Sequence, residues 1–528
     1  MTEHESDTTN TAPQPLTTSK RLMHNTIFNL VTLVSNAVIG FLLVRFFLGR
    51  LGEPRYGVWL IVGSLFKYRG ILGMGLNSSV NRYVPVFLAK NDPDSVQRVV
   101  STALTFFTVM AAAGILLALL VYWNVDSWFV IRPDLIAAAG WVVLLTGAFI
   151  ALSMPLQPFS AVLSGLQRYD LINLAEFSCL ILRTALLVVL LLRGYGLMAM
   201  AVVFGISELA TRLVQYAFVR RLLPDLSISF SHVDLRLLRE MMAYGINTFL
   251  YVAGVLIICK ANEWVIGITL DTALIPQFYA VTAAVLILYQ LVQGFTRAVK
   301  PAVSDLDARD EHARIKEVAF LTQKYCLLLI IPGVCFLVVM GRDFLWLWVG
   351  ERFADPVPTI DRMTKMLTIL AIGLGLLFAQ YSNFIVLVGR GDHKIFGILS
   401  ICTAFACVVA AVVAVKLFNG GLVSIAWATF VPTALISGLI LPMYFNWKMN
   451  ISARESGSRV WLPAFLGALP AVLLICAWKY LAAPDSWMKI LTVVGSAGAL
   501  IVAASWCLAM EPLERQRFLR VVRRRTQA

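Results

Sequence analysis

The chain consists of long apolar segments that follow one another with short polar connections between them. About fourteen of these segments reach the roughly 20 residues that a helix needs to cross ~30 Å of hydrocarbon. They lie near residues 25–48, 56–80, 99–123, 135–158, 169–193, 197–219, 242–266, 275–298, 320–341, 363–388, 395–417, 421–445, 461–482 and 487–509. Lipid cannot satisfy an open strand edge, so each segment must be a helix. The sequence therefore predicts an all-α polytopic membrane protein.

The composition is too apolar for a soluble protein, and the connections are too short to hold a catalytic domain. The 528 residues are 59% hydrophobic and 14% charged, and the mean hydropathy is +0.79, unlike ordinary soluble domains. The sequence has no GxxxxGK(S/T) loop, GxSxG elbow or HExxH motif, so neither ATP hydrolysis nor hydrolase chemistry is expected. Its eight cysteines show no CxxC spacing and its five histidines lie in tails and loops. We therefore expect a carrier rather than an enzyme, with no metal or cofactor.

Lysine and arginine gather in alternate connections, which sets the expected orientation. The rich set comprises Lys20, Arg21, Arg82, Lys90, Arg98, Arg168, Arg220, Arg221, Arg236, Arg239, Arg297, Lys300, Arg309, Arg314, Lys316, Arg390, Lys394, Arg454 and the tail from Arg515 to Arg525. Cytoplasmic loops of membrane proteins carry this excess, so both termini are predicted to be cytoplasmic. The net charge of +14 reflects this asymmetry and attraction to anionic membrane lipids, and nucleic acid is not an expected partner.

Short signatures recur between the two halves of the chain. Gly196-Leu197 with Ala201 reappears as Gly421-Leu422 with Ala426, and the triplet at 163–165 reappears at 387–389. Arg82 with Pro85 is matched by Arg297 with Pro301, and all these offsets lie near 215 to 225 residues. Duplicated halves are the plan of many transporters, with the substrate site between the repeats.

These features divide the chain into six parts. They are a polar N-terminus predicted to be disordered, a first lobe of six helices, a surface linker, a second lobe of six helices, two appended helices and a basic tail. The boundaries are 1–24, 25–223, 224–241, 242–446, 447–510 and 511–528. Each lobe has an even number of helices and both start on the cytoplasmic side, so we expect a pseudo-two-fold axis along the membrane normal.

The second apolar segment carries two cations near mid-depth. Lys67 and Arg69 stand among Gly63, Gly70 and Gly73, and no acid lies in the same segment. A charge at that depth costs at least ~2.5–3.5 kcal/mol, so it usually faces a wet cavity or a partner. The glycines allow the helix to bend there. We expect a cationic surface for an anionic substrate, with a charge that holds neighbouring helices together as the alternative.

Further polar groups lie in other segments. Gln290, Gln293 and Arg297 share one face of the eighth segment, where Arg297 is equally well placed to anchor the helix at the interface,. Arg183 lies deep in the fifth segment. We expect Arg183, Arg297 and Gln293 to add to the substrate site.

Two acid–base pairs have helical spacing within the membrane. Glu208 and Arg212 are four residues apart, which predicts an intrahelical ion pair,. The alternative is that Glu208, the most central acid, binds a coupling cation. Lys260 and Glu263 lie near the outer end of the seventh segment, where we expect a pair that snorkels to the interface.

Several short motifs together resemble the Wzx-type polysaccharide flippases of the MOP superfamily. The motifs lie at 51–59 (LGEPRYGVW), 73–79 (GMGLNSS), 82–83 (RY), 163–169 (LSGLQRY) and 345–350 (LWLWVG). The resemblance covers the first twelve segments. It implies a multi-pass protein of a bacterial inner membrane that moves undecaprenyl-diphosphate-linked oligosaccharide from the cytoplasmic to the periplasmic leaflet. Such relatives have two helical lobes around a cationic cavity and work by alternating access.

The resemblance also implies partners and leaves alternatives. A polysaccharide polymerase and a chain-length regulator are the protein partners it implies, beside the lipid-linked oligosaccharide itself. The two appended segments are not universal in these flippases and also occur in the lipid II flippase, so a role with the peptidoglycan precursor stays open. A multidrug exporter of the same superfamily is a further alternative, although it would be expected to use carboxylates for organic cations, and central cations outnumber central acids here.

Overall fold

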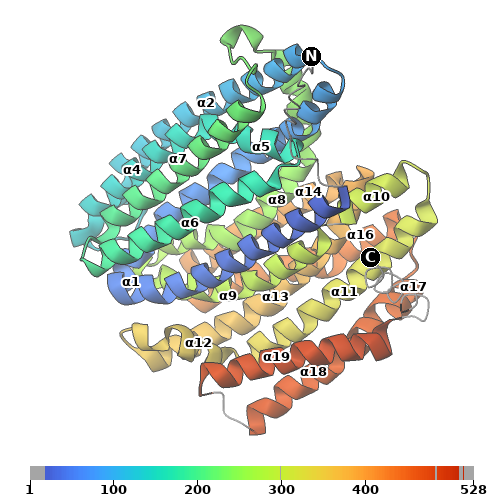
Figure 1. Cartoon of the computed structure of the whole chain (residues 1–528). Coiled ribbons are helices and arrows are strands. Elements are labelled where there is room, and N and C mark those ends of the chain that lie inside the picture. Colours follow the sequence, from blue (N-terminus) through green and yellow to red (C-terminus); the bar gives the residue numbers. More distant parts are fainter. Residues whose placement is uncertain (1–17, 298, 482–484, 511–514, 516–528) are drawn as a thin grey trace, which may run out of the picture.

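The structure is a computed structural model of the chain, and it describes the backbone of residues 18–297, 299–481, 485–510 and 515. The side chains of residues 18–34, 37, 65–75, 230, 244, 508 and 509 lie outside the described part. Residues 1–17 of the N-terminus that was predicted to be disordered lie outside the described part, and so does the basic tail apart from Arg515. Every regular element in the described ranges is helical (Figure 1).

The helices follow the order of the predicted apolar segments. The first part of the chain forms α1 (Thr18–Ala89), α2 (Pro93–Trp123), α3 (Val125–Trp128), α4 (Ile136–Ser153), α5 (Gln157–Gly165), α6 (Tyr169–Leu192) and α7 (Gly196–Leu222). The second part forms α8 (Leu235–Thr269), α9 (Ile275–Thr296), α10 (Val299–Asp307), α11 (His312–Val339), α12 (Gly341–Val349), α13 (Pro356–Arg390), α14 (Lys394–Lys416), α15 (Leu422–Leu435) and α16 (Leu441–Lys448). The last helices are α17 (Ala453–Ser456), α18 (Leu462–Leu481) and α19 (Trp487–Ala504).

Short turns of tighter or wider helix connect or extend these elements. The tighter 3₁₀ turns are Pro133–Leu135, Met154–Leu156, Phe230–His232, Thr272–Leu274 and Gly350–Arg352. The wider π turns are Ile436–Ile440, Gly457–Trp461 and Ser505–Ala509.

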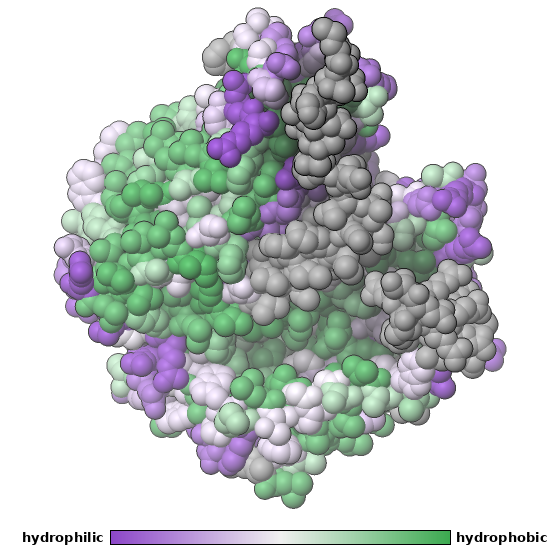
Figure 2. All heavy atoms as spheres, viewed as in Figure 1, coloured by the Kyte–Doolittle hydropathy of each residue, from purple (hydrophilic) through white to green (hydrophobic). Residues whose placement is uncertain are grey.

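Twelve helices among the described residues are long and apolar enough to cross a membrane. They begin with Pro93–Trp123 and end with Trp487–Cys507. Figure 2 shows hydrophobic side chains over much of the visible flank and hydrophilic residues near the ends of the helices. The expectation of an all-helical polytopic membrane protein is thus confirmed.

The helix α1 is a single hydrogen-bonded element with a break at Gly52. The backbone there is non-helical, with φ 75° and ψ 169°. Only glycine adopts this region readily, because a Cβ would clash with the backbone. The break separates a stretch before Gly52 from a second one that carries Lys67 and Arg69 in its middle.

The helices form two lobes that Figure 1 shows one above the other. In the first lobe α2 packs on α4, α4 on α7, and α6 on α7. In the second lobe α14 packs on α8, while α13 contacts α9, α11 and α15. The helix α18 packs against α11 and α19, along the lower edge of the view. The helix α1 contacts members of both lobes, including α5 and α8.

The two ends of the bundle differ in how the lobes pack. We call the end with residues 224–234 and α10 the linker end, and the opposite end the α12 end. One hydrophobic core combines the α12-end half of the first lobe, including Phe129 and Val142, with the second lobe. At the linker end, the first lobe has a separate core around Phe107, Phe159 and Met241. Among the described residues, the core that combines large parts of both lobes thus lies at the α12 end, while at the linker end the first turns of α8 pack into the first-lobe core.

Capping residues fix where helices begin at the linker end. The Ser95 hydroxyl and amide donate hydrogen bonds to Asp92 at 2.5 and 3.0 Å, and these bonds lower the pKa of the Asp92 carboxyl at the start of α2. Asp234 accepts from the amides of Leu237 and Arg236, which likewise lowers its pKa. Carboxylates at N-caps satisfy amides that have no partner inside the helix.

Candidate functional site

A seal between the lobes closes the α12 end. The Val130 amide donates to the Gly267 carbonyl at 2.8 Å, and the Thr272 amide donates back to the Val130 carbonyl at 3.1 Å. We call these two hydrogen bonds the main-chain seal. Gly57 of α1 packs against the same turn so closely that a Cβ there would lie 1.9 Å from the Thr272 oxygen. The absence of a side chain at Gly57 is what permits this contact.

Polar side chains reinforce the seal. The Gln277 amide donates to Glu53 at 3.0 Å, and Arg362 donates to the Gln277 oxygen at 2.8 Å. The Trp264 indole donates to the Ser64 hydroxyl at 2.5 Å. These contacts connect the second half of α1 to α8, α9 and α13, so they hold both lobes at one end.

A cavity of about 260 Å³ lies on the inner side of the seal, between α1, α8, α9 and α12. Aromatic and aliphatic side chains form most of its wall, including Phe41 and Trp348, whose rings stack 4.4 Å apart. Its polar lining comes from Asn36, Lys260, Tyr279 and Gln290. A mostly apolar wall with a few converging polar groups is typical of a binding site.

The charged residue in the wall of this cavity is Lys260, which pairs with Glu263, three residues later on α8. The Lys260 ammonium lies 3.0 Å from the Glu263 carboxylate, and the two side chains are only 6% and 2% exposed. The ammonium also lies 4.6 Å from the centre of the Tyr279 ring. The second Glu263 oxygen is buried without a hydrogen-bond partner among the described residues.

The buried position of this pair corrects the expectation that it snorkels to the interface. Both residues lie on the face of α8 that points into the protein, in the turn where Cys259 and Asn262 are also buried. A buried ion pair is costly to desolvate. A charged pair that is buried beside a cavity between the lobes, despite this desolvation cost, is a candidate for a functional role.

The predicted ion pair between Glu208 and Arg212 is confirmed. The Arg212 Nε donates to the Glu208 carboxylate at 2.9 Å, and its Nη1 donates to Gln215 at 2.9 Å. Arg183 lies nearby on α6, with its guanidinium carbon 4.7 Å from the centre of the Phe204 ring. The first lobe thus holds its own cluster of charges between α6 and α7.

The other predicted site residues are placed as follows. The side chains of Lys67 and Arg69 lie outside the described part. Gln293 lies within hydrogen-bonding reach of Tyr289 and Tyr381, so it faces the second lobe. Arg297 is exposed at the linker end of α9. The structure therefore does not bring Arg183, Gln293 and Arg297 into a single contact cluster.

The comparisons with known proteins agree with this architecture. A family described as polysaccharide biosynthesis protein matches residues 83–358. A Shigella flexneri protein named "putative O-antigen transporter" is 22% identical over 344 residues, which cover 63% of this chain and 78% of that protein.

Solved structures show a similar fold. The lipid II flippase MurJ in an inward closed conformation superposes with a TM-score of 0.69 at 14% identity, over 92% of this chain and 98% of that one. An inward-facing multidrug resistance MATE transporter of the MOP superfamily gives 0.59 at 15% identity, over 80% and 98%. The fold and the family match together carry one conclusion. The chain belongs to the polysaccharide biosynthesis (Wzx-like) protein family, and it has the fold of the MurJ and MATE structures.

Proposed function

We propose that the protein is a flippase for undecaprenyl-diphosphate-linked oligosaccharide, which it moves from the cytoplasmic to the periplasmic leaflet of a bacterial inner membrane. The observation that carries the proposal is the cavity between the lobes, with the buried Lys260 in its wall. A diphosphate is a strong anion, and a buried ammonium can bind it if the anion replaces Glu263. The relative named an O-antigen transporter supports the same substrate class.

The arrangement in the membrane follows from the helices and the charges. We propose fourteen spans, because α1 would supply two, one on each side of Gly52, beside the twelve others. The lysine-rich and arginine-rich connections lie at the linker end, which is then cytoplasmic together with both termini. The two lobes would be related by a pseudo-two-fold axis along the membrane normal. With its seal at the α12 end, this conformation would be open toward the cytoplasm, as alternating access requires.

Within this proposal the charges have separate roles. Lys67, Arg69 and Arg183 would supply positive charge toward the diphosphate, with Arg297 and Gln293 guiding it at the cytoplasmic entrance. Glu208 would bind the coupling cation. A polysaccharide polymerase and a chain-length regulator would act on the flipped product.

A lipid II flippase is the second candidate. The structural likeness to MurJ covers 98% of that chain and 92% of this one, which includes most of the helices that follow the two lobes as well as the lobes themselves. A MATE-like exporter of organic cations has less support, because Glu208 and Glu263 already pair with the side chains of Arg212 and Lys260.

Transport by the purified protein in liposomes tests the proposal. Fluorescent lipid-linked oligosaccharide and lipid II would be offered in separate samples, and the fraction that crosses would be measured by chemical quenching. We expect rapid crossing of the oligosaccharide conjugate. Crossing of lipid II alone would replace the proposal with the second candidate, and crossing of neither would overturn both.

Neutral substitution of the two central cations should weaken substrate binding. A charge-assisted hydrogen bond contributes about 1.5–3 kcal/mol, so Lys67→Ala or Arg69→Ala should lower the affinity roughly ten- to hundredfold. Lys67→Arg should be milder because it keeps the charge. The affinity is measured by titration in nanodiscs, with thermal unfolding as the check on folding. Full flipping by a stably inserted Lys67→Ala, Arg69→Ala double variant would contradict the proposed role.

Replacing the acid of the first lobe separates coupling from structure. Glu208→Gln should leave flipping independent of the ion gradient at a normal protein level, because the carboxylate that binds the cation is gone. Arg212→Gln removes the other half of the pair and serves as the control, since it should keep the gradient dependence. If both variants lose stability alike and neither changes the gradient dependence, Glu208 has only a structural role.

A further inference from the structure

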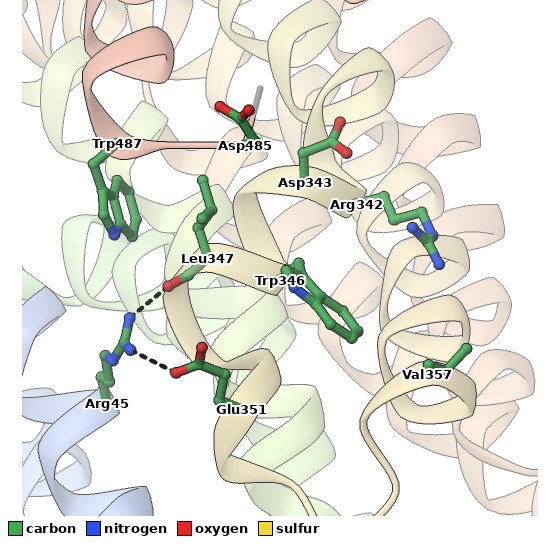
Figure 3. Close-up of a pocket in the computed structure, with 9 residues that line it drawn as sticks. All are labelled: Arg45, Arg342, Asp343, Trp346, Leu347, Glu351, Val357, Asp485 and Trp487. Carbon is green, nitrogen blue, oxygen red and sulfur yellow. Dashed lines mark hydrogen bonds and ion pairs between the residues drawn. The ribbon is translucent and has the colours of Figure 1, made fainter. Parts of the chain in front are cut away.

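A second, larger cavity of about 620 Å³ lies at the α12 end, outside the central cavity. Figure 3 shows the nine side chains that line it, with Trp346 and Trp487 on either side of the α12 backbone at Leu347. Its walls come from α1, α12, the start of α13 and the start of α19. We call this cavity the outer groove.

The charged groups of the outer groove neutralise one another. Arg45 donates to the Leu347 carbonyl at 2.5 Å and to Glu351 at 3.1 Å (Figure 3). Arg342 pairs with Asp361 at 2.9 Å, Asp343 pairs with Lys479, and Asp485 pairs with Lys489 at 2.8 Å. The groove therefore offers many donors and acceptors at fixed positions, yet little net charge. Such a surface favours hydroxyl groups over an anion.

Two tryptophans add flat apolar faces to this polar ring. Trp346 is 38% exposed. Trp487 is partly buried and is held edge-on by Phe41 and Phe344, with ring centres 5.6 and 6.2 Å apart. The C–H groups on one face of a sugar ring pack well on an indole face, while the sugar hydroxyls reach the surrounding donors and acceptors. The chemistry is that of a saccharide site.

A cationic depression of about 470 Å³ adjoins the outer groove, and Arg45 lines both. Its other cations are Arg50 and Arg352, which are exposed and make no ion pair among the described residues. Its apolar wall includes Leu42, which is 60% exposed on α1. The guanidinium groups of Arg50 and Arg352, next to a lipid-facing wall, suit a diphosphate whose tail stays in the membrane.

We propose that the outer groove and the cationic depression together form a site that holds the lipid-linked oligosaccharide after translocation, with the glycan against Trp346 and the diphosphate at Arg50 and Arg352. The inference rests on the proposed flippase function. Phe41 and Trp348 form one wall of the central cavity, and Trp487 packs edge-on against the same Phe41 ring. A glycan that leaves the central cavity at this end therefore meets the groove next.

Binding of two soluble probes to the full-length protein in zwitterionic nanodiscs tests the site. The probes are the free oligosaccharide released by mild acid from the host's lipid-linked intermediate, and inorganic pyrophosphate. Trp346→Ala should weaken oligosaccharide binding roughly tenfold, because truncating a tryptophan that a bound ligand covers typically costs that much affinity. Pyrophosphate binding should stay unchanged. An Arg50→Gln, Arg352→Gln double variant should do the reverse.

The matched control is Trp128→Ala, at the same end of the molecule and 39% exposed, which should change neither affinity. Val357→Trp should block the oligosaccharide by filling the groove from an exposed position, which keeps the test valid if Trp346→Ala does not fold. Oligosaccharide affinities unchanged in both groove variants would overturn the site, even if flipping in liposomes is normal. Oligosaccharide binding that depends on Trp346, in a protein that flips no lipid-linked glycan, would keep the site and overturn the proposed function.

Discussion

Replacing Glu263 by Leu is expected to lower the free energy of unfolding by about 3–5 kcal/mol, because it leaves the Lys260 ammonium buried without its counter-ion. The Lys260 ammonium and the Glu263 carboxylate are 3.0 Å apart, and both side chains are almost fully buried, so the ammonium would lose its counter-ion in a poorly hydrated position. Reversible unfolding in mixed micelles measures the change.

Two controls make this expectation specific. A Lys260→Met, Glu263→Leu double variant should recover most of the lost stability, since a buried pair replaced by apolar residues is often neutral. It should still flip poorly, because the cavity has lost its ammonium. Glu351→Leu removes the partner of Arg45, but the Glu351 side chain is 72% exposed, so it should cost less than ~1 kcal/mol. Equal losses from Glu263→Leu and Glu351→Leu would refute the role assigned to burial.

Gly57→Ala is expected to break the main-chain seal and stop transport. The new Cβ would lie 1.9 Å from the Thr272 oxygen and 2.7 Å from its carbonyl carbon. Both are backbone atoms, so the lobes themselves must move apart. Hydrogen exchange of the Val130 and Thr272 amides should accelerate roughly tenfold or more, since both donate across the seal,.

Gly63→Ala is the matched control on the same helix. Among the described residues, its Cβ would meet only the Trp59 ring, at 3.8 Å, so exchange and flipping should stay at wild-type levels. Slow amide exchange and normal flipping in Gly57→Ala would show that closure of the α12 end does not depend on the contact between Gly57 and Thr272.

The spans themselves were predictable, because length and hydrophobicity decide them. The predicted segment 169–193 is α6, Tyr169–Leu192, and the segment 395–417 is α14, Lys394–Lys416. The break in α1 could also be anticipated in part, since Gly52 lies in a polar connection. The start of α8 at Leu235 was not visible, because an amphipathic turn with Met241 in the first-lobe core precedes the apolar stretch.

The candidate site was harder to predict, because it depends on which helix faces which. The spacing of Glu208 and Arg212 fixes their contact, since both lie on one face of one helix. The position of Lys260 along the sequence indicated an interface, yet its neighbours from α1 and α9 bury it. The hydrophobicity of the segment and the helical spacing of the pair do not carry that information. The buried Asn262 and Cys259 beside it were the available signal that this turn faces protein.

The main-chain seal has a consequence for how such a protein can change over time. Its two hydrogen bonds use amides and carbonyls that every residue except proline supplies,. The exposed side chain at position 130 can therefore be exchanged with little effect on how firmly the two lobes close. Trp346, which we propose contacts the glycan, lies on α12, so under that proposal the glycan preference can change while the closing energy stays constant. Recognition and gating are thus free to evolve separately.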